Sequence, residues 1–158
     1  QKTLFSRFNE RSIDISWGRI FFPYGPNEDK SRFFSSLIVG LLNNNNVECN
    51  NPHLIRDYIH VRDVASAFVV LLESDFTGPI NISSGNAYSL GDLASLIATK
   101  MNKTNLLDLG EEISENNNQI PQIVGDNSLL KSLGWKENYN IDKGIEDLIN
   151  TLNNERIK

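Results

Sequence analysis

The chain has 158 residues, 39% of them hydrophobic, and a formal net charge of −5 at pH 7, which suits one globular core and argues against a nucleic-acid-binding surface. Its single cysteine, Cys49, excludes an intrachain disulfide. The longest apolar run, residues 67–72, is far too short to cross a bilayer, so we predict a cytoplasmic protein that binds neither nucleic acid nor membrane.

The beginning of the chain has the pattern of a helix, a strand and a second helix. Residues 1–10 carry apolar side chains at helical spacing, and residues 12–22 alternate in the manner of a strand. Residues 23–29, rich in proline and glycine, are predicted to break that strand, and residues 33–42 repeat with the period of a helix. Since no capping residue precedes residues 1–10, we expect the chain to be a fragment that starts inside a helix.

Two short strands, residues 47–49 and 54–61, are predicted ahead of a long helix at residues 61–73. That helix is expected to bury one apolar stripe against a sheet. The stripe consists of Val61, Val64, Ala65, Phe68, Leu71 and Leu72. Residues 78–85 then predict a short buried strand bounded by two glycines.

The last third of the chain is predicted to be mostly helical. Ser89 and Asp92 have the spacing of a capping box ahead of a helix that reaches Met101. The remaining predicted elements are a strand at 105–109, a polar loop at 110–119, a short helix at 128–133 and a helix from Asp142. Strands that alternate with helices indicate an α/β fold, with small mixed sheets packed with helices and not a complete doubly wound sheet.

Few of the familiar catalytic or binding motifs are present. The sequence contains no Gly-x-Gly-x-x-Gly turn and no Walker loop, so it lacks the usual glycine cradle for a dinucleotide. Cys49, His53 and His60 match no standard zinc spacing, and we predict that the chain has no metal site.

The stretch from Leu54 to Asp63 is the strongest candidate for a binding site. In a strand, Arg56, Tyr58 and His60 lie on one face. A guanidinium beside a phenol suits a phosphate, because arginine offers a charged fork and tyrosine a neutral donor. The same residues also fit a charged turn that leads into a core helix, closed by an ion pair within residues 56–57 or 62–63. Residue spacing leaves both interpretations open.

Four segments, in this order, resemble the extended short-chain dehydrogenase/reductases. They are "WGRIFFPYGPNE" (17–28), "RDYIHVRDVASAFVVLLE" (56–73), "GPINISSGNAYSLGDLASLI" (78–97) and "LGWKENYNIDKGIEDLI" (133–149). Within that group the chain is similar to the NAD-dependent nucleotide-sugar epimerases and dehydratases. The resemblance extends over nearly the whole chain and favours a phosphate role for Arg56.

The resemblance implies a larger enzyme, usually a homodimer, in which an N-terminal Rossmann domain holds NAD or NADP and a Tyr-x-x-x-Lys pair carries the proton and hydride chemistry. The family places that lysine farther ahead of the Arg19 position than this chain reaches, and Lys2 has no tyrosine in the required place. The catalytic pair is therefore absent. The chain would be a C-terminal portion: residues 1–29 would hold the tail of the catalytic helix and a Rossmann strand, and residues 30–158 the substrate-binding portion.

The resemblance also assigns binding roles to particular residues, with a nucleoside diphosphate sugar as the ligand. By position, Ile20 is implied to approach the nicotinamide, and Phe21 and Phe22 the sugar. Arg32, Phe33 and Cys49 are implied to approach the base. Arg56 and Tyr58 are implied to bind the diphosphate. The residues alone fit a structural role equally well for Ile20, and core packing for the three phenylalanines.

Three departures from the family pattern weaken these assignments, and two of them, the missing asparagine and the missing arginine, favour an alternative function. Phe22 stands where an asparagine is common, residues 50–52 replace a Gly-Asp-Gly turn, and residues 116–119 contain no second phosphate-binding arginine. A non-catalytic binding or regulatory module that keeps the fold is therefore the competing hypothesis.

Overall fold

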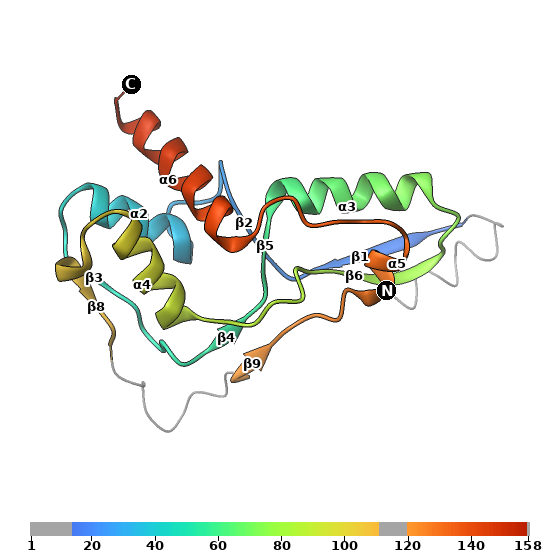
Figure 1. Ribbon diagram of the computed structural model, residues 1–158, viewed down its shortest axis with the longest axis horizontal. Helices are drawn as coiled ribbons and strands as arrows, with labels where there is room; N and C mark the ends of the chain where they lie inside the picture. The colour runs from blue at the N-terminus through green and yellow to red at the C-terminus, as the bar shows by residue number, and fades with distance from the viewer. Residues whose placement is uncertain (1–13, 111–119, 158) are drawn as a thin grey trace.

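A computed structural model of the chain describes residues 14–110 and 120–157 and has the expected α/β fold (Figure 1). The predicted helix at 1–10 and nearly all of the predicted loop at 110–119 lie outside the described residues. The helices are α2 (Phe33–Leu42), α3 (Val61–Glu73), α4 (Leu90–Lys100), α5 (Ser128–Ser132), α6 (Ile141–Ile157) and the 3-10 helix η1 (Thr104–Leu106). The strands are β1 (Ser16–Ile20), β2 (Phe22–Tyr24), β3 (Val47–Glu48), β4 (Ile55–Arg56), β5 (Tyr58–His60), β6 (Gly78–Ile82), β7 (Tyr88–Ser89), β8 (Leu107–Asp108) and β9 (Gln122–Ile123).

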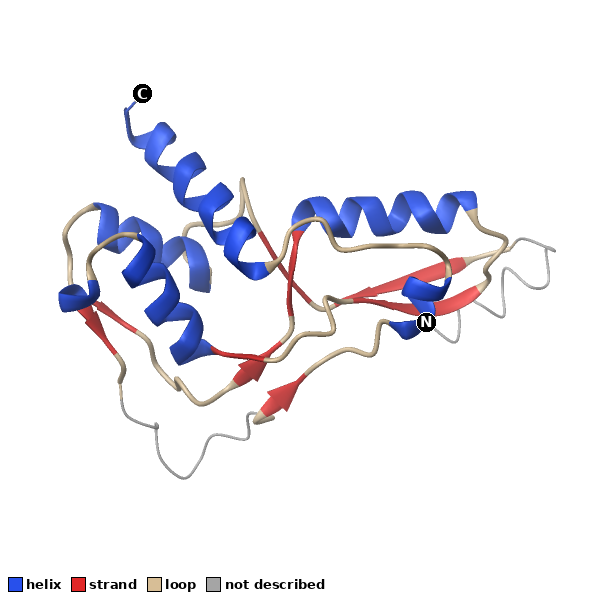
Figure 2. Ribbon diagram, in the orientation of Figure 1, coloured by secondary structure: helices blue, strands red, loops and turns tan. Residues whose placement is uncertain are grey.

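The molecule has two lobes, and the paired strands β2 and β5 run between them (Figure 2). In what we call the β1 lobe, helices α3 and α5 pack on the parallel pair of β1 and β6. Its buried side chains are those of Ile59, Val64, Ala67, Leu71, Ile80, Ile82, Leu130 and Trp135. In the α2 lobe, helices α2, α4 and α6 surround a second core, to which Phe34, Ile38, Leu41, Leu93, Ile97, Ile145 and Leu148 contribute.

Gly18 allows α3 to approach the sheet of the β1 lobe closely. It pairs with Ile80 in the parallel register of β1 and β6. A Cβ at this position would lie 2.6 Å from Cδ1 of Ile82 and 2.9 Å from the ring of Phe68. Because real Cβ atoms do not come this close to other heavy atoms, a larger residue would force the side chains of Ile82 and Phe68, or α3 itself, to shift.

The buried face of α3 differs from the predicted apolar stripe. Val64 and Leu71 are buried as expected, together with Ala67 and the acidic Asp63. Phe68 is partly exposed, and the side chain of Leu72 is 86% exposed. We attribute the difference to a polar contact. The Asp63 carboxylate accepts hydrogen bonds from the backbone N–H groups of residues 138–139, and the face of α3 that carries Asp63 therefore points inward.

The predicted break at residues 23–29 begins too early. Pro23 and Tyr24 belong to β2, which pairs in parallel with β5 through Pro23 and Ile59. Within the described residues β5 is the only strand beside β2, so Pro23 lies on an edge strand, where proline is tolerated. The chain leaves the strand only after Tyr24, and a further interruption at Phe21, which was not predicted, separates β1 from β2.

The strand predicted at residues 54–61 is divided at Asp57 into β4 and β5. The Asp57 side chain is completely buried. Oδ1 accepts hydrogen bonds from the backbone N–H and the hydroxyl of Ser84, both at 2.8 Å, and Oδ2 accepts the N–H groups of Gly85 and Gly125, both at 3.0 Å. One carboxylate thus ties the β4–β5 bend to the segments that follow β6 and β9, where the lobes meet.

Helix α6 packs against β2 through a glycine. A Cβ at Gly144 would overlap the hydroxyl of Tyr24 and lie 3.2 Å from the ring of His60. Glycine costs a helix about 1 kcal/mol relative to alanine, and here the close approach of the two elements accounts for it. In the described part of the chain, no helix is long and apolar enough to span a membrane.

Candidate functional site

Arg56 and Tyr58 lie on either side of the bend at Asp57, and both are nearly buried. Nη1 of Arg56 donates hydrogen bonds to the carbonyl oxygens of Ile55, Ile120 and Pro121 at 2.8, 3.0 and 3.3 Å. The guanidinium carbon lies 5.7 Å from the ring centre of Phe22, in range of a cation–π contact.

The two ion pairs expected of a simple charged turn are not formed. Asp57 is saturated by serine and glycine donors, as described above, and Asp63 is engaged by the backbone of residues 138–139. Nη1 of Arg62 donates to the hydroxyl of Tyr139 at 2.6 Å, and its Nη2 lies 3.7 Å from the Asp147 carboxylate. The charged-turn interpretation of the Leu54–Asp63 stretch is therefore wrong in its contacts.

Aromatic rings surround Tyr58. The ring centre of Phe22 lies 5.7 Å away in a tilted arrangement, and that of Phe33 lies 6.0 Å away and nearly parallel. Burial raises the pKa of Tyr58 to about 12, while the guanidinium groups of Arg56 and Arg32 act in the opposite direction. Tyr58 is thus a neutral hydrogen-bond donor at physiological pH, as its predicted role requires.

Six of the eight predicted binding residues come together in this region. We call them the Tyr58 cluster: Phe22, Arg32, Phe33, Cys49, Arg56 and Tyr58. Cys49 is buried in the same core as Tyr58, and burial raises the pKa of its thiol. The members come from β2, from the start of α2, from the end of β3 and from the β4–β5 bend, so the cluster is assembled by tertiary packing.

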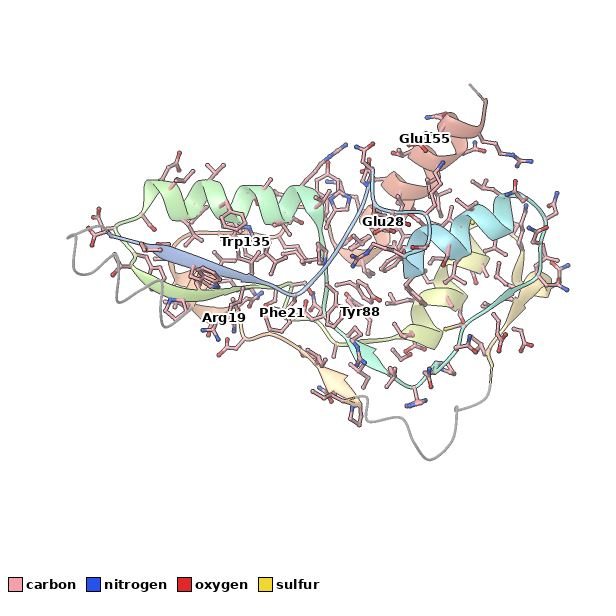
Figure 3. All side chains as sticks on the ribbon, turned by 180° about the vertical axis from the view of Figure 1, so that it is seen from behind. Arg19, Phe21, Glu28, Tyr88, Trp135 and Glu155 are labelled. Atoms are coloured by element: carbon pink, nitrogen blue, oxygen red, sulfur yellow. The ribbon has the colours of Figure 1, made fainter. Side chains whose placement is uncertain are left out.

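Ile20 and Phe21 lie outside the cluster, at the carboxyl end of β1. Ile20 pairs with Ile82 and its side chain is 43% exposed. The backbone N–H of Phe21 donates to the carbonyl of Ile82 at 3.1 Å, and its ring packs against Gly125. In Figure 3, Phe21 and Tyr88 both appear in the middle of the molecule.

A cavity of about 310 Å³ lies beside the start of α2, at the small end of the range for ligand pockets. It is lined by residues 23–29 together with Arg32 and Val61. The Glu28 carboxylate accepts the backbone N–H of Ser35 at 3.0 Å and fixes this loop to the first turn of α2. The wall therefore includes one member of the Tyr58 cluster, Arg32, whose Nη2 donates to the carbonyl of Pro23 at 3.4 Å.

Sequence reasoning missed a second polar group, at the junction of α3 and α6. His60 caps α3 and faces Asp147 of α6, and it stacks on Tyr139 with ring centres 4.3 Å apart. No sequence signal could pair residues so far apart, although histidine before a helix is a recognisable capping position. Tyr139 and Lys143 have the spacing of a catalytic Tyr-x-x-x-Lys pair, but Nζ of Lys143 lies over the tyrosine ring, 4.1 Å from its centre.

Candidate metal ligands do not gather in the described ranges. Across residues 14–110 and 120–157, no three His, Cys, Asp or Glu side chains are grouped so that they could hold a metal ion.

Sequence comparison identifies one family model, described as the NAD dependent epimerase/dehydratase family, which matches residues 3–91. A CDP-abequose synthase from Salmonella typhimurium is 31% identical over 152 residues, which cover 91% of this chain and 50% of that protein. The chain thus spans about half the length of the curated relatives that it matches.

Solved structures share the fold. A UDP-N-acetylglucosamine 4-epimerase from Methanobrevibacter ruminantium, in complex with UDP-N-acetylmuramic acid, superposes with a TM-score of 0.86 at 20% identity, covering 97% of this chain and 50% of that one. A UDP-glucose 4-epimerase from Thermus thermophilus, in complex with NAD, gives a TM-score of 0.82 at 18% identity, covering 96% and 51%.

Proposed function

The chain belongs to the NAD-dependent epimerase/dehydratase family, and on this premise we propose that it is the nucleotide-sugar-binding portion of an NAD(P)-dependent epimerase, dehydratase or reductase. The observation that carries the proposal is the Tyr58 cluster itself. It places a nearly buried guanidinium, a neutral phenol and two aromatic rings at one point between the lobes.

Arg56 is the proposed diphosphate ligand. Its Nη1 atom is held by three carbonyl oxygens, which fix the guanidinium plane. The other nitrogens make no hydrogen bond to the described residues and would bind the ligand. Charge-assisted hydrogen bonds of this kind are stronger where water is excluded, and Arg56 is only 9% exposed. Tyr58 would add one neutral donor, and Arg32 a second cation nearby.

The aromatic members of the cluster would contact the apolar faces of the sugar and the base. Phe22 lies between the end of β1 and Arg56, so it would face the sugar with Phe21, and Phe33 with Cys49 would border the base. Aromatic rings offer a large, rigid surface for such contacts.

The carboxyl end of β1 fits a nicotinamide ring. Ligands of α/β sheets bind outside the carboxyl ends of parallel strands, and there Ile20 presents an apolar side chain that is 43% exposed. NAD or NADP would supply hydride transfer, and Ile20 would contact the ring. We infer that this chain alone does not turn over a nucleotide sugar, because it has no catalytic Tyr-x-x-x-Lys pair at the family's position, and that the whole enzyme is a homodimer.

Calorimetric titration with UDP-, CDP- and dTDP-hexoses, and with the free diphosphates, tests the proposal at fixed salt. Arg56→Lys keeps the positive charge but loses the bidentate guanidinium group. Tyr58→Phe keeps the aromatic ring but loses the hydroxyl that would donate a hydrogen bond. Each is expected to weaken binding about 10-fold or more, the worth of a hydrogen bond to a charged group. Arg156→Gln, at the far end of α6, is the matched control and should bind like the wild type.

The outcomes separate the two hypotheses. Variants that remain folded by circular dichroism and bind as tightly as the wild type would contradict the assignment of Arg56 and Tyr58. Turnover by this chain alone would contradict the inference that it is inactive without the rest of the enzyme. Binding that depends on Arg56, in a full-length protein that has no epimerase, dehydratase or reductase activity, would instead favour the non-catalytic binding module.

A further inference from the structure

The imidazole of His60 joins three elements and is completely buried. It ends β5, caps α3 and faces α6, and Figure 1 shows α3 and α6 beginning close together. The Tyr24 ring meets it edge-on at 5.4 Å, and the Tyr139 ring stacks on it. We call His60, Tyr24, Tyr139 and Asp147 the His60 joint.

The hydrogen bonds of the joint fix which nitrogen carries the proton. Nδ1 of His60 accepts the backbone N–H of Arg62 at 3.3 Å, so it is unprotonated and the proton is on Nε2. Nε2 lies 3.4 Å from Oδ2 of Asp147 without a well-formed hydrogen bond. Protonation would place a second proton on Nδ1, where it would face the N–H group of Arg62. Two donors would then oppose each other, and the hydrogen bond would be lost. The cap on α3 therefore exists only while His60 is neutral.

The charged and titratable groups around His60 come from each neighbouring element. They are Tyr24 on β2, Arg62 and Asp63 on α3, Tyr139 before α6, and Lys143 and Asp147 on α6. Burial, the largest influence, lowers the pKa of His60, and the Asp147 carboxylate opposes this effect. Oδ2 of Asp147, which faces Nε2, is buried and has no hydrogen-bond partner among the described residues, so an imidazolium would meet an uncompensated carboxylate oxygen.

We propose that the His60 joint is an acid-sensitive switch, in which protonation of His60 removes the cap of α3, strengthens the attraction between the imidazolium and Asp147, and so changes how the first turn of α3 is held beside α6. The first turn of α3 also holds Asp63, which binds the backbone of residues 138–139, so loss of the cap is transmitted to the segment that leads into α6.

The sign of the effect on stability follows from linkage. The folded protein binds a proton at His60 less readily than the unfolded chain, whose histidines titrate near pH 6.5. The stabilisation is therefore fully present above pH 6.5 and is lost as the pH falls through the pKa of His60 in the folded protein.

NMR titration of the wild-type chain from pH 8 to pH 4.5 tests the switch. The chain has only two histidines, so the signal of His60 can be assigned with His53→Asn. His60 is expected to titrate below the value of about 6.5 for histidines in unfolded chains. The indole N–H of Trp135, which donates to the carbonyl of Asp63 and the hydroxyl of Ser66, should shift with the titration of His60.

Variants separate the switch from general acid sensitivity. His60→Asn supplies a cap that does not titrate and should abolish the Trp135 shift between pH 7.5 and 5, whereas His53→Asn should leave it unchanged. Asp147→Asn removes the carboxylate that favours the imidazolium and should move the transition to lower pH. The proposal is overturned if His60 titrates at or above about pH 6.5, the value for histidines in unfolded chains, a result that needs no variant to fold, or if His60→Asn keeps the wild-type transition.

Discussion

Replacement of Asp57 by asparagine is the most demanding test of how the lobes are held together. The carboxylate accepts four hydrogen bonds, two at each oxygen, from Ser84, Gly85 and Gly125. An amide has only one oxygen, so in either orientation its NH₂ group faces two donors. Two charge-assisted hydrogen bonds are lost, each worth about 1.5–3 kcal/mol, and the free energy of unfolding should fall by about 3–6 kcal/mol.

Urea denaturation followed by circular dichroism measures this loss, which is a large share of the stability of an ordinary domain. Asp126→Asn is the matched control, because its carboxylate also accepts two bonds from Ser128 but is exposed to solvent. That variant should change the free energy of unfolding by about 0.5 kcal/mol. Equal effects of the two substitutions would refute the reasoning from burial.

Three further predictions concern single positions. Gly144→Ala should destabilise the protein by about 1–3 kcal/mol in urea denaturation, because the added methyl group overlaps the Tyr24 hydroxyl; an unchanged or increased stability would show that α6 can shift. Ser89→Ala should cost about 1 kcal/mol by the same measurement, since the Ser89 hydroxyl accepts the N–H of Asp92 at 3.0 Å and caps α4; no loss would mean that water replaces the cap. Cys49, 2% exposed and with its thiol pKa raised by burial, should react with a disulfide reagent at pH 8 only after unfolding; rapid reaction of the native protein would contradict this placement.

Local sequence patterns correctly predicted the elements that depend only on neighbouring residues. The helix at 33–42 and the cap at Ser89 were both predicted, because apolar period and capping chemistry are local. The burial of α3 was wrong in phase because Asp63 turns inward to bind residues 138–139, a contact with no signature in hydropathy. Pro23 was taken for a breaker because the sequence does not show that β2 would be an edge strand.

The candidate site depended on information beyond local pattern. Alternation in a strand correctly related Arg56 to Tyr58, but only the family resemblance suggested that Phe22 and Phe33 belong near them. The contact of His60 with Asp147 could not be predicted, because it joins residues from distant parts of the chain whose types are common at surfaces. The binding roles of the eight residues and the division at residue 29 stay predictions, although β1 pairs across that boundary with β6.

The strand pairings have a consequence for the rate of folding. Residues 16–20 pair with 78–82, 22–24 with 58–60, 47–48 with 107–108, and 55–56 with both 88–89 and 122–123. Within the described residues, no two strands are joined by a tight hairpin, so every pairing must close a long loop before it yields any stabilising contact. We therefore expect α2, α3 and α4 to form early and the strands to pair late, which makes the chain a slow folder for its size.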